Sequence, residues 1–279
     1  MTYKEAVESG TRILKQAEIA DAGLDAWYLL QMVTKIERSF YYIHGDEELT
    51  TDEQNEYEIA VRKRAEHIPL QYIIGEQEFM GLKFKVNPNV LIPRQDTETL
   101  VEEVIKVVHP GMKVLDLCTG SGCILISVMR NVSDIEGTGC DISKPALLVA
   151  KENAKNNEVE AEWVRSDLFD NLAGKYDVII SNPPYIRTEE ILRLMPEVRD
   201  FEPHDALDGR EDGLYFYRKI TEQAQDYLNS DGYLYLEIGH DQGEAVAELM
   251  KNAGYLDVEV VKDLAHNDRV VKGKGKSYV

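Results

Sequence analysis

The chain has 279 residues, of which 43% are hydrophobic and 29% charged, with 31 lysines and arginines against 51 aspartates and glutamates. That length makes two domains the default expectation, and the composition is that of an ordinary globular protein. The formal charge of −20 repels nucleic-acid phosphates unless positive charge gathers in a patch, and acidic residues outnumber basic ones both in residues 1–75 and in the remainder.

Metal, disulfide and membrane chemistry find no support in the sequence. Cys118, Cys123 and Cys140 show neither CxxC spacing nor paired histidines, so we expect no zinc site and no disulfide framework. The first residues, "MTYKEAVESG", lack the apolar core of a signal peptide, and no run approaches the length of a membrane span. We therefore expect a cytoplasmic protein that uses no metal.

Residues 1–75 have the periodicity of helices. In "YKEAVESGTRILKQA", Val7 and Leu14 lie close to one helical face. Thr51 followed by Gln54 predicts a capping box at the start of a third helix. We expect a small helical domain over residues 1–75 that recognises a protein substrate, because so acidic a bundle is poorly suited to DNA.

The period changes between residues 76 and 93. There "EFMGLKFKVNPNVLIPR" alternates apolar and polar residues around Asn87-Pro88-Asn89. This pattern predicts a β-hairpin linker over residues 76–93. The motifs described next lead us to expect a ligand-binding catalytic domain over residues 94–279.

From Lys113 onward, runs typical of strands alternate with runs typical of helices. The expected strands are "KVLDLC", "IEGTGCDI", "AEWVRSD", "YDVIIS" and "GYLYLEIG". Such alternation predicts an α/β fold with a mostly parallel sheet, helices on both faces and right-handed crossovers. In this architecture ligands bind at the carboxyl ends of the strands, where the strand order reverses.

The run "VLDLCTGSGC" predicts a buried strand, a glycine turn and a helix. Gly120 and Gly122 lack a Cβ atom, so a ligand can lie directly on the backbone, and the helix N-terminus attracts a carboxylate. Asp116, near the end of the strand, can accept from an ammonium group. The spacing does not match the G-x-G-x-x-G dinucleotide motif. A ligand with an α-carboxylate and an α-amine would fit, whereas a purely structural turn is the alternative.

Two further acidic residues follow the next two expected strands. Asp141 occupies the position where a carboxylate commonly binds ribose hydroxyls. Asp167 can accept from an exocyclic amine while Leu168 covers a base. Taken singly, each acid could equally be a helix cap or a solvated loop residue. Together with Asp116 and the glycine turn, they describe a nucleoside that carries an amino acid, which is the shape of S-adenosylmethionine.

The fourth expected strand ends in Asn182-Pro183-Pro184-Tyr185. Residues that precede proline avoid the α region, and proline offers only a carbonyl, so this segment is stiff and rich in acceptors. The Asn182 carboxamide oxygen and the Pro183 carbonyl can each accept one N–H of a planar NH₂ group. Tyr185 can stack on that group and shield a sulfonium. The segment predicts alignment of the nitrogen of a planar NH₂ group with a methyl donor; a diproline turn that merely closes a strand is the alternative.

With these motifs, the chain resembles class I methyltransferases that modify planar amino groups, and most closely the release factor glutamine methyltransferases (HemK/PrmC family). The resemblance covers essentially the whole chain and is carried by "IPLQYIIG", "LIPRQDTETLVE", "VLDLCTGSGC", "SNPPYI", "FEPHDALDGREDGLYFYRKI", "LEIGHDQG" and "DLAHNDRVV". It implies a helical domain before a Rossmann-like domain with a seven-stranded sheet. It also implies methyl transfer from S-adenosylmethionine to the glutamine N5 in the Gly-Gly-Gln loop of peptide chain release factors, which aids translation termination.

The resemblance also implies roles for particular residues. The cofactor would be faced by Cys118, Thr119, Gly120, Ser121, Gly122, Asp141, Leu168 and Asn182. The glutamine would be held by Asn182, Pro183, Pro184 and Tyr185, with Asn182, Pro183 and Tyr185 as the catalytic group. Asp116 and Asp167 join the cofactor site from the strand-end argument alone. Because Cys118 stands where that family usually has glycine, we expect its backbone to avoid positive φ.

Two other functions fit parts of the sequence. An N6-adenine methyltransferase shares the NPPY motif, but it would need a basic groove and a pocket for a flipped base. A non-catalytic scaffold would keep the fold without needing Asp141, Asn182 and Tyr185 together. We therefore expect a monomer whose partners are release factors, with no stable binding to DNA or membranes.

Overall fold

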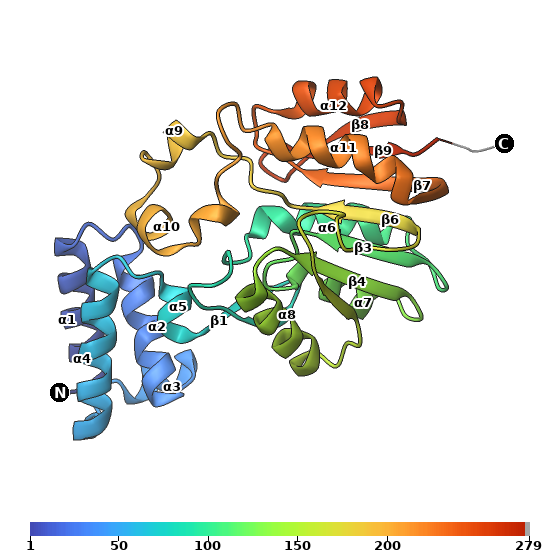
Figure 1. Cartoon of the computed structure of the whole chain (residues 1–279). Coiled ribbons are helices and arrows are strands. Elements are labelled where there is room, and N and C mark those ends of the chain that lie inside the picture. The colour runs from blue at the N-terminus through green and yellow to red at the C-terminus, as the bar shows by residue number, and fades with distance from the viewer. Residues whose placement is uncertain (277–279) are drawn as a thin grey trace. The chain divides into compact units, whose positions relative to one another are not determined.

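In the computed structural model, which describes residues 1–276, the chain divides into two compact units (Figure 1). The first comprises residues 1–75 together with residues 195–201. The second comprises residues 76–194 and the chain from Glu202 onward. No helix within the described residues is long and apolar enough to cross a lipid bilayer.

Helices form the first unit, as its periodicity predicted. They are α1 (Tyr3–Gln16), α2 (Ala22–Thr34), α3 (Arg38–His44), α4 (Thr51–Ala65), α5 (Leu70–Ile74) and α10 (Pro196–Phe201). The buried Tyr57 hydroxyl joins three of them, because it donates to the carbonyls of Ala6 at 3.0 Å and Ala26 at 3.2 Å. Gly10 makes this contact possible, since a Cβ there would lie 2.2 Å from the same hydroxyl.

The cap of α4 lies one residue earlier than the sequence predicted. Thr50 Oγ1 accepts from the Glu53 backbone N–H at 3.3 Å, and Glu53 Oε2 accepts from the Thr50 N–H at 2.8 Å. Thr51 and Gln54 show the same spacing, but a carboxylate is favoured over an amide beside the positive helix N-terminus. The predicted capping box is therefore wrong by one position.

Residues 195–201 belong to the first unit through a buried ion-pair group. Arg64, which is 5% exposed, donates from Nε to Asp25 Oδ2 at 2.7 Å and from Nη1 to Glu197 Oε2 at 3.0 Å. Removing one partner of such a group leaves an uncompensated buried charge. This contact joins α10 to helices that precede it by more than a hundred residues.

The predicted hairpin exists, but its turn lies elsewhere. Its strands, paired antiparallel, are β1 (Glu76–Phe79) and β2 (Leu82–Lys85). They are connected by Met80 and Gly81, with φ of 51° and 71°. A two-residue hairpin turn of this kind needs positive φ at both positions, which Pro88 cannot adopt. The predicted turn at residues 87–89 is therefore wrong, and that segment follows β2 instead.

Within residues 1–276, seven strands of the second unit form one sheet, in the order β5-β4-β3-β6-β7-β9-β8. They are β3 (Lys113–Leu117), β4 (Glu136–Asp141), β5 (Glu162–Arg165), β6 (Tyr176–Ser181), β7 (Leu228–Glu237), β8 (Leu256–Lys262) and β9 (Asp268–Lys274). Strands β3 to β7 are parallel, and β9 runs antiparallel between β7 and β8. The predicted α/β class with a mostly parallel seven-stranded sheet is confirmed.

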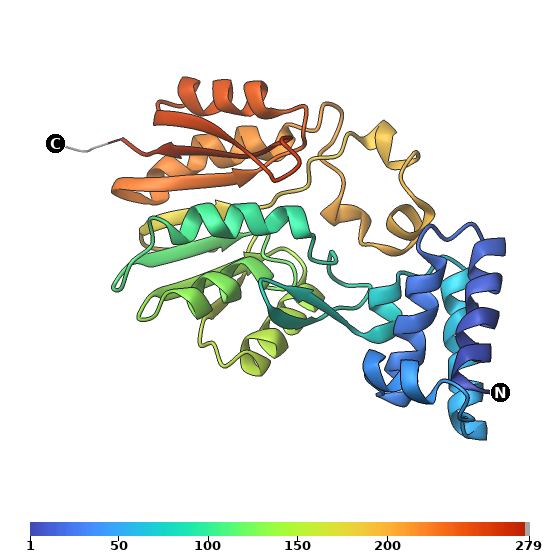
Figure 2. The same cartoon turned by 180° about the vertical axis from the view of Figure 1, so that it is seen from behind.

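Helices cover both faces of this sheet (Figures 1 and 2). The longer ones are α6 (Glu98–Ile105), α7 (Cys123–Asn131), α8 (Lys144–Asn156), α11 (Tyr215–Tyr227) and α12 (Gly243–Asn252). The second unit also contains the short helices η1 (Gln95–Thr97), α9 (Thr188–Ile191) and η2 (His204–Ala206). Alternate residues of β3 enter opposite cores, because Val114 packs with α6 and α7 whereas Leu115 packs with α11 and α12.

Candidate active site

The strand order reverses between β3 and β6. After β3 the chain adds β4 and β5 on one side, and it then crosses to place β6 on the other side. Leu117 at the end of β3 pairs with both Cys140 of β4 and Ser181 of β6. The segments that follow these three strand ends therefore emerge side by side, where ligands bind in doubly wound sheets.

The turn after β3 has left-handed backbone at three positions. The φ angles of Cys118, Gly120 and Gly122 are 58°, 53° and 81°. The prediction that Cys118 avoids positive φ is therefore wrong. A hydrogen bond from the Thr119 N–H to the Cys140 carbonyl, at 2.9 Å, holds this conformation. Left-handed backbone costs a non-glycine residue on the order of 1–2 kcal/mol.

The two glycines of this turn serve different purposes. A Cβ on Gly122 would lie 2.9 Å from the Trp163 ring, so this glycine permits close packing. A Cβ on Gly120 would meet no heavy atom of the described residues within 4 Å. The backbone at Gly120 is therefore open on the side where a ligand can approach.

Asp116 lies beneath the turn rather than on its surface. Its side chain is 0% exposed, and its Oδ2 accepts from the Thr119 hydroxyl at 2.6 Å. Its Oδ1 atom is buried without a hydrogen-bond partner among the described residues. Burial raises the pKa of this carboxyl to about 7, against the lowering effect of the Thr119 hydrogen bond. Asp116 thus supports the turn from below.

Asp141 connects the turn after β3 to the loop after β4. Its Oδ2 accepts from the Gly120 N–H at 2.9 Å, and its Oδ1 accepts from the Ser143 N–H at 2.8 Å. Each carboxylate oxygen keeps a second lone pair, so both can still accept from hydroxyl groups. Burial raises the pKa of Asp141, opposed by these backbone hydrogen bonds.

Asp167 and Leu168 follow β5. Asp167 is exposed, whereas Leu168 is 6% exposed and packs in the apolar cluster that contains Leu117 and Cys140. The Leu168 backbone is left-handed, with φ of 47°. The structure thus places both residues at a strand end adjacent to Asp141, with only Asp167 open to solvent.

The Asn182–Tyr185 segment follows the central strand β6. Ser181 just before it donates from its hydroxyl to the Leu117 carbonyl at 2.9 Å, which joins the ends of β6 and β3. Pro183 and Pro184 are buried, while Asn182 and Tyr185 are partly exposed. Asn182 Nδ2 lies 3.5 Å from Thr97 Oγ1. The carboxamide nitrogen therefore faces the protein, which leaves the oxygen available to a ligand.

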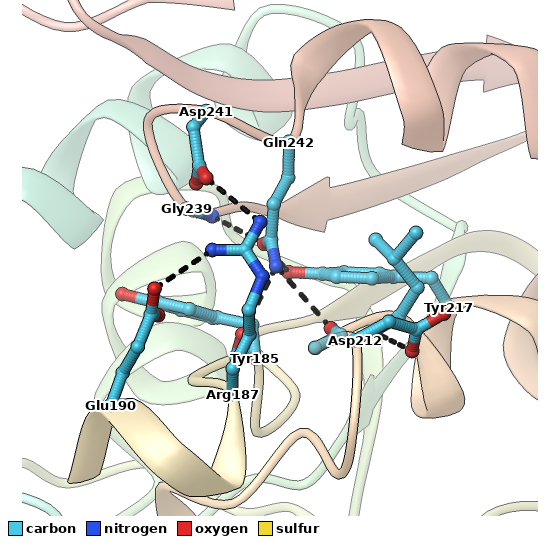
Figure 3. Close-up of polar contacts among 10 residues, drawn as sticks. Tyr185, Arg187, Glu190, Asp212, Tyr217, Gly239, Asp241 and Gln242 are labelled. Atoms are coloured by element: carbon cyan, nitrogen blue, oxygen red, sulfur yellow. Dashed lines mark hydrogen bonds and ion pairs between the residues drawn. The ribbon is translucent and has the colours of Figure 1, made fainter. Parts of the chain in front are cut away.

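Gln242, which the sequence reasoning did not assign, holds the backbone of Tyr185 (Figure 3). Its Nε2 donates to the Tyr185 carbonyl at 3.0 Å and to the Gly213 carbonyl at 3.4 Å. Its Oε1 accepts from the Gly239 N–H at 2.9 Å and lies 3.4 Å from the Tyr217 hydroxyl. The side chain is 3% exposed, so its hydrogen-bonding capacity is used inside the protein.

Two glycines of the segment "DGREDG" pack directly against Tyr185. A Cβ on Gly209 would lie 2.7 Å from Tyr185 Cα, and one on Gly213 would lie 2.5 Å from the Tyr185 carbonyl oxygen. Any side chain there would displace the tyrosine backbone. The paired glycines were the sequence signal for this contact, but their partner is distant in the chain and cannot be read from spacing.

Ion pairs fasten the chain beyond Tyr185 (Figure 3). Arg187 contacts Asp241 at 2.9 Å and Glu190 at 3.1 Å. Asp208, which is 5% exposed, accepts from the Thr188 hydroxyl at 2.6 Å. The segment after the NPPY motif is therefore held to the loop that follows β7 and to the segment around Asp208.

Glu237 is a second buried carboxyl that the sequence reasoning missed. It is the last residue of β7 and is 1% exposed. Burial raises its pKa to about 7, and hydrogen bonding from the side chains of Thr97 and Asn182 opposes that rise. Its signal in the sequence was an acidic residue that ends the apolar run "YLYLEIG". Within residues 1–276 no group of three histidine, cysteine or acidic side chains could hold a metal ion.

Comparison with known proteins identifies the class of this fold and site. Residues 94–196 match the methyltransferase small domain. A solved methyltransferase from Pyrococcus furiosus shares the fold, with a TM-score of 0.53 and 17% identity over 70% of this chain and 90% of that one. The T. thermophilus 16S rRNA N2 G1207 methyltransferase, solved with AdoMet and guanosine, also shares the fold. Its TM-score is 0.54 and its sequence identity is 16%, over 72% of this chain and 50% of that one. The second unit is a methyltransferase domain of class I.

Sequence relatives identify the family. Residues 5–75 match the PrmC N-terminal domain. The release factor glutamine methyltransferase of Thermodesulfovibrio yellowstonii is 41% identical over 88% of this chain and 90% of its own length. That of Geobacter sulfurreducens is 37% identical over 98% and 96% of the two chains. The chain belongs to the release factor glutamine methyltransferase family, which confirms the resemblance carried by its motifs.

Proposed function

We propose that this protein transfers a methyl group from S-adenosylmethionine to the side-chain nitrogen of the glutamine in the Gly-Gly-Gln loop of a peptide chain release factor. The observation that carries the proposal is the place of Asn182–Tyr185. This stiff, acceptor-rich segment follows β6 at the reversal of strand order, beside the open turn at Gly120. The family membership supplies the substrate class, because the relatives are named for that reaction.

The residues present fit S-adenosylmethionine. The open backbone at Gly120 leaves room for an amino-acid carboxylate at the start of α7. Cys118, Thr119, Ser121 and Gly122 complete that turn. Asp116 holds it from beneath through Thr119, and its Oδ1, which has no partner among residues 1–276, would accept from the ammonium group of the cofactor. The spare lone pairs of the Asp141 carboxylate suit ribose hydroxyls.

The remaining cofactor contacts are proposed at the end of β5. Asp167 is exposed there and would accept from the adenine amine. Leu168, next to it, would cover the base. Asn182 at the end of β6 would face both the cofactor and the substrate.

The Asn182–Tyr185 segment would hold the reacting carboxamide by hydrogen bonds and stacking. Asn182 Oδ1 and the Pro183 carbonyl would each accept one N–H of the substrate NH₂ group. Pro184 stiffens the segment, and Tyr185 would stack on the carboxamide plane. When bound, S-adenosylmethionine supplies an electrophilic methyl group on a sulfonium.

Positioning would account for most of the catalysis. The amide nitrogen forms a bond to the methyl carbon as the carbon–sulfur bond breaks, and the bonding pair remains on sulfur. The methylated nitrogen then loses a proton to water, so no strong base is needed beforehand. Alignment of this kind can contribute roughly 7–11 kcal/mol.

The first unit would recognise the substrate. We assign residues 1–75 to release-factor recognition, residues 76–93 to a linker and residues 94–279 to S-adenosylmethionine binding and catalysis. The match of residues 5–75 to a domain named for this family supports that division. Release factors act in the cytoplasm, so the enzyme would work there, and we propose that it does so as a monomer.

Mass spectrometry of a release factor after incubation with S-adenosylmethionine tests this function. We expect one added methyl group, located on the glutamine of the Gly-Gly-Gln loop. Labelled cofactor should be offered in parallel to duplex DNA. Label that entered DNA and not the protein would reverse the assignment in favour of an adenine methyltransferase. Absence of S-adenosylmethionine binding would instead favour a non-catalytic scaffold.

A further inference from the structure

Glu237 lies beside the catalytic segment in the sheet. Ser181 of β6 pairs with Leu236 of the parallel strand β7. The next residues along the two strands are Asn182 and Glu237, so their side chains emerge at neighbouring positions. Glu237 is 1% exposed, and its Oε2 atom has no hydrogen-bond partner among residues 1–276. A buried acidic side chain with spare acceptor capacity thus lies behind the carboxamide of Asn182.

The surrounding charges leave this carboxylate poorly compensated. Arg269 of β9, whose charge lowers the pKa of Glu237, contacts Asp263 and Asp96, each at 3.1 Å. One guanidinium therefore serves two other carboxylates, and no ion pair to Glu237 is present among the described residues. Five titratable groups from neighbouring segments interact electrostatically with Glu237. They are Asp96, Cys123, Tyr185, Tyr217 and Arg269.

An ionised carboxylate can only accept hydrogen bonds. Asn182 must therefore turn its NH₂ group, and not its oxygen, toward Glu237. Thr97, which is 2% exposed, supports this orientation with its hydroxyl 3.5 Å from Asn182 Nδ2. The Asn182 oxygen then faces away from Glu237, toward the position proposed for the substrate amide.

We propose that ionised Glu237 is a positioning residue, which fixes the Asn182 carboxamide with its oxygen presented to the N–H groups of the substrate glutamine. The inference rests on the proposed function, because it needs Asn182 to accept from the substrate. Protonation of Glu237 reverses the preference, since a carboxylic acid donates one hydrogen bond. That donor would attract the Asn182 oxygen and turn the Asn182 NH₂ group toward the substrate. Two NH₂ groups would then face each other, and the substrate N–H groups would lose their acceptor.

The inference predicts a dependence of turnover on pH. Burial raises the pKa of Glu237 to about 7, so its ionised fraction falls about tenfold between pH 8 and pH 6. With saturating cofactor and release factor, we expect kcat of the wild-type enzyme to fall by that factor. Glu237→Gln cannot ionise, and its kcat should change less than twofold over the same range. At pH 8 the variant should be ~10-fold slower than wild type.

Glu103→Gln is the matched control. Glu103 is another buried carboxyl next to the sheet, but it pairs with Lys272 at 2.8 Å and with Lys106. These contacts lower its pKa, against the effect of burial. The control variant should keep the wild-type pH dependence of kcat. It should unfold at a lower denaturant concentration at pH 8, where Glu237→Gln should unfold at a higher one because it removes a poorly compensated buried charge.

The outcomes separate this inference from the proposed function. If wild type methylates the glutamine but Glu237→Gln retains its pH dependence, Glu237 has no positioning role and the function stands. A higher unfolding midpoint for Glu237→Gln with unchanged kcat at pH 8 would likewise overturn the inference. If wild type methylates no release factor at any pH between 6 and 8, the proposed function fails and the inference falls with it.

Discussion

The side-chain amide of Gln242 donates to the main-chain carbonyl of Tyr185 at 3.0 Å, across 57 residues of sequence. Because Gln242 is almost fully buried and also accepts from the Gly239 N–H, it fixes the end of the NPPY segment relative to the loop after β7. The position of the tyrosine ring therefore depends on a residue that need not touch the substrate.

Replacement of Gln242 by Glu should impair catalysis more than cofactor binding. The carboxylate would face the carbonyls of Tyr185 and Gly213, which now accept from the Gln242 NH₂ group. We expect a loss of 1–3 kcal/mol in the free energy of unfolding and a roughly 10- to 100-fold lower kcat. Steady-state kinetics and calorimetric cofactor titration check this. Gln16→Glu, at an exposed position of α1, is the control. Equal losses in kcat and in cofactor affinity would contradict the positioning role.

Asn182→Ala should separate turnover from cofactor affinity. The substitution removes one of the two proposed acceptors for the substrate N–H groups, so we expect kcat to fall roughly 10²- to 10³-fold. The dissociation constant of S-adenosylmethionine should change by less than about threefold, because Asp141 and the glycine turn remain. Single-turnover kinetics and calorimetry measure the two quantities. A near-normal rate would refute the role of Asn182.

Asp141→Ala should weaken S-adenosylmethionine binding. The change removes the proposed ribose acceptor and also leaves the N–H groups of Gly120 and Ser143 without their partner. We expect affinity to fall by about 1–3 kcal/mol, or roughly 5- to 150-fold, in equilibrium binding. The circular dichroism spectrum should remain that of the wild type. Unchanged affinity would remove Asp141 from the cofactor site.

Stability of the ligand-free protein should fall as pH rises from 5 to 8. Burial raises the pKa of both Asp116 and Glu237 to about 7, from ordinary values of 3.8 and 4.5. The neutral form of each carboxyl thus favours the folded state, and its contribution is lost as pH approaches and passes 7. Each group contributes a slope of up to ~1.4 kcal/mol per pH unit.

Urea unfolding at several pH values measures this slope. Asp116→Asn combined with Glu237→Gln should flatten it between pH 5 and pH 8. Other acidic groups change the stability only below that range. Hydrogen bonds from Arg218, for example, lower the pKa of Asp212 to about 2. A wild-type stability that rose with pH in this window would show that neither carboxyl is held neutral in the fold.

Gly10→Ala should destabilise the first unit without altering cofactor binding. The new methyl group would lie 2.2 Å from the Tyr57 hydroxyl and 3.2 Å from the Ala26 Cβ, and overpacking of this kind costs about 1–3 kcal/mol. Thermal unfolding measures the cost. Combination with Tyr57→Phe should recover part of it, because the closest clashing atom is removed. Additive losses in the double variant would show that the two residues do not interact.

Local rules were sufficient where competing choices were few, and they failed where two choices were similar. Thr50 and Thr51 both begin a capping box by spacing, and only the contact with Glu53 decides between them. Met80–Gly81 and residues 87–89 both contain turn-forming residues, but only the former can adopt positive φ at both positions. The left-handed Cys118 is a different case, because the fold imposes there a conformation that a local preference would reject.

The sequence by itself determined the α/β class, the motif that follows each of the expected parallel strands, and the family. It could do so because apolar periodicity and the residues at strand ends are local features of the chain. It also placed Asp141 and Asn182 at the ends of strands, where ligands bind in this architecture. Only the tertiary structure decided that Asp116 lies beneath the turn and that Gln242 holds Tyr185. The tertiary structure alone showed that the buried Glu237 lies next to Asn182 in the neighbouring strand. These relationships depend on which distant segments pack together and on how deeply they bury a charge, and residue spacing carries neither quantity.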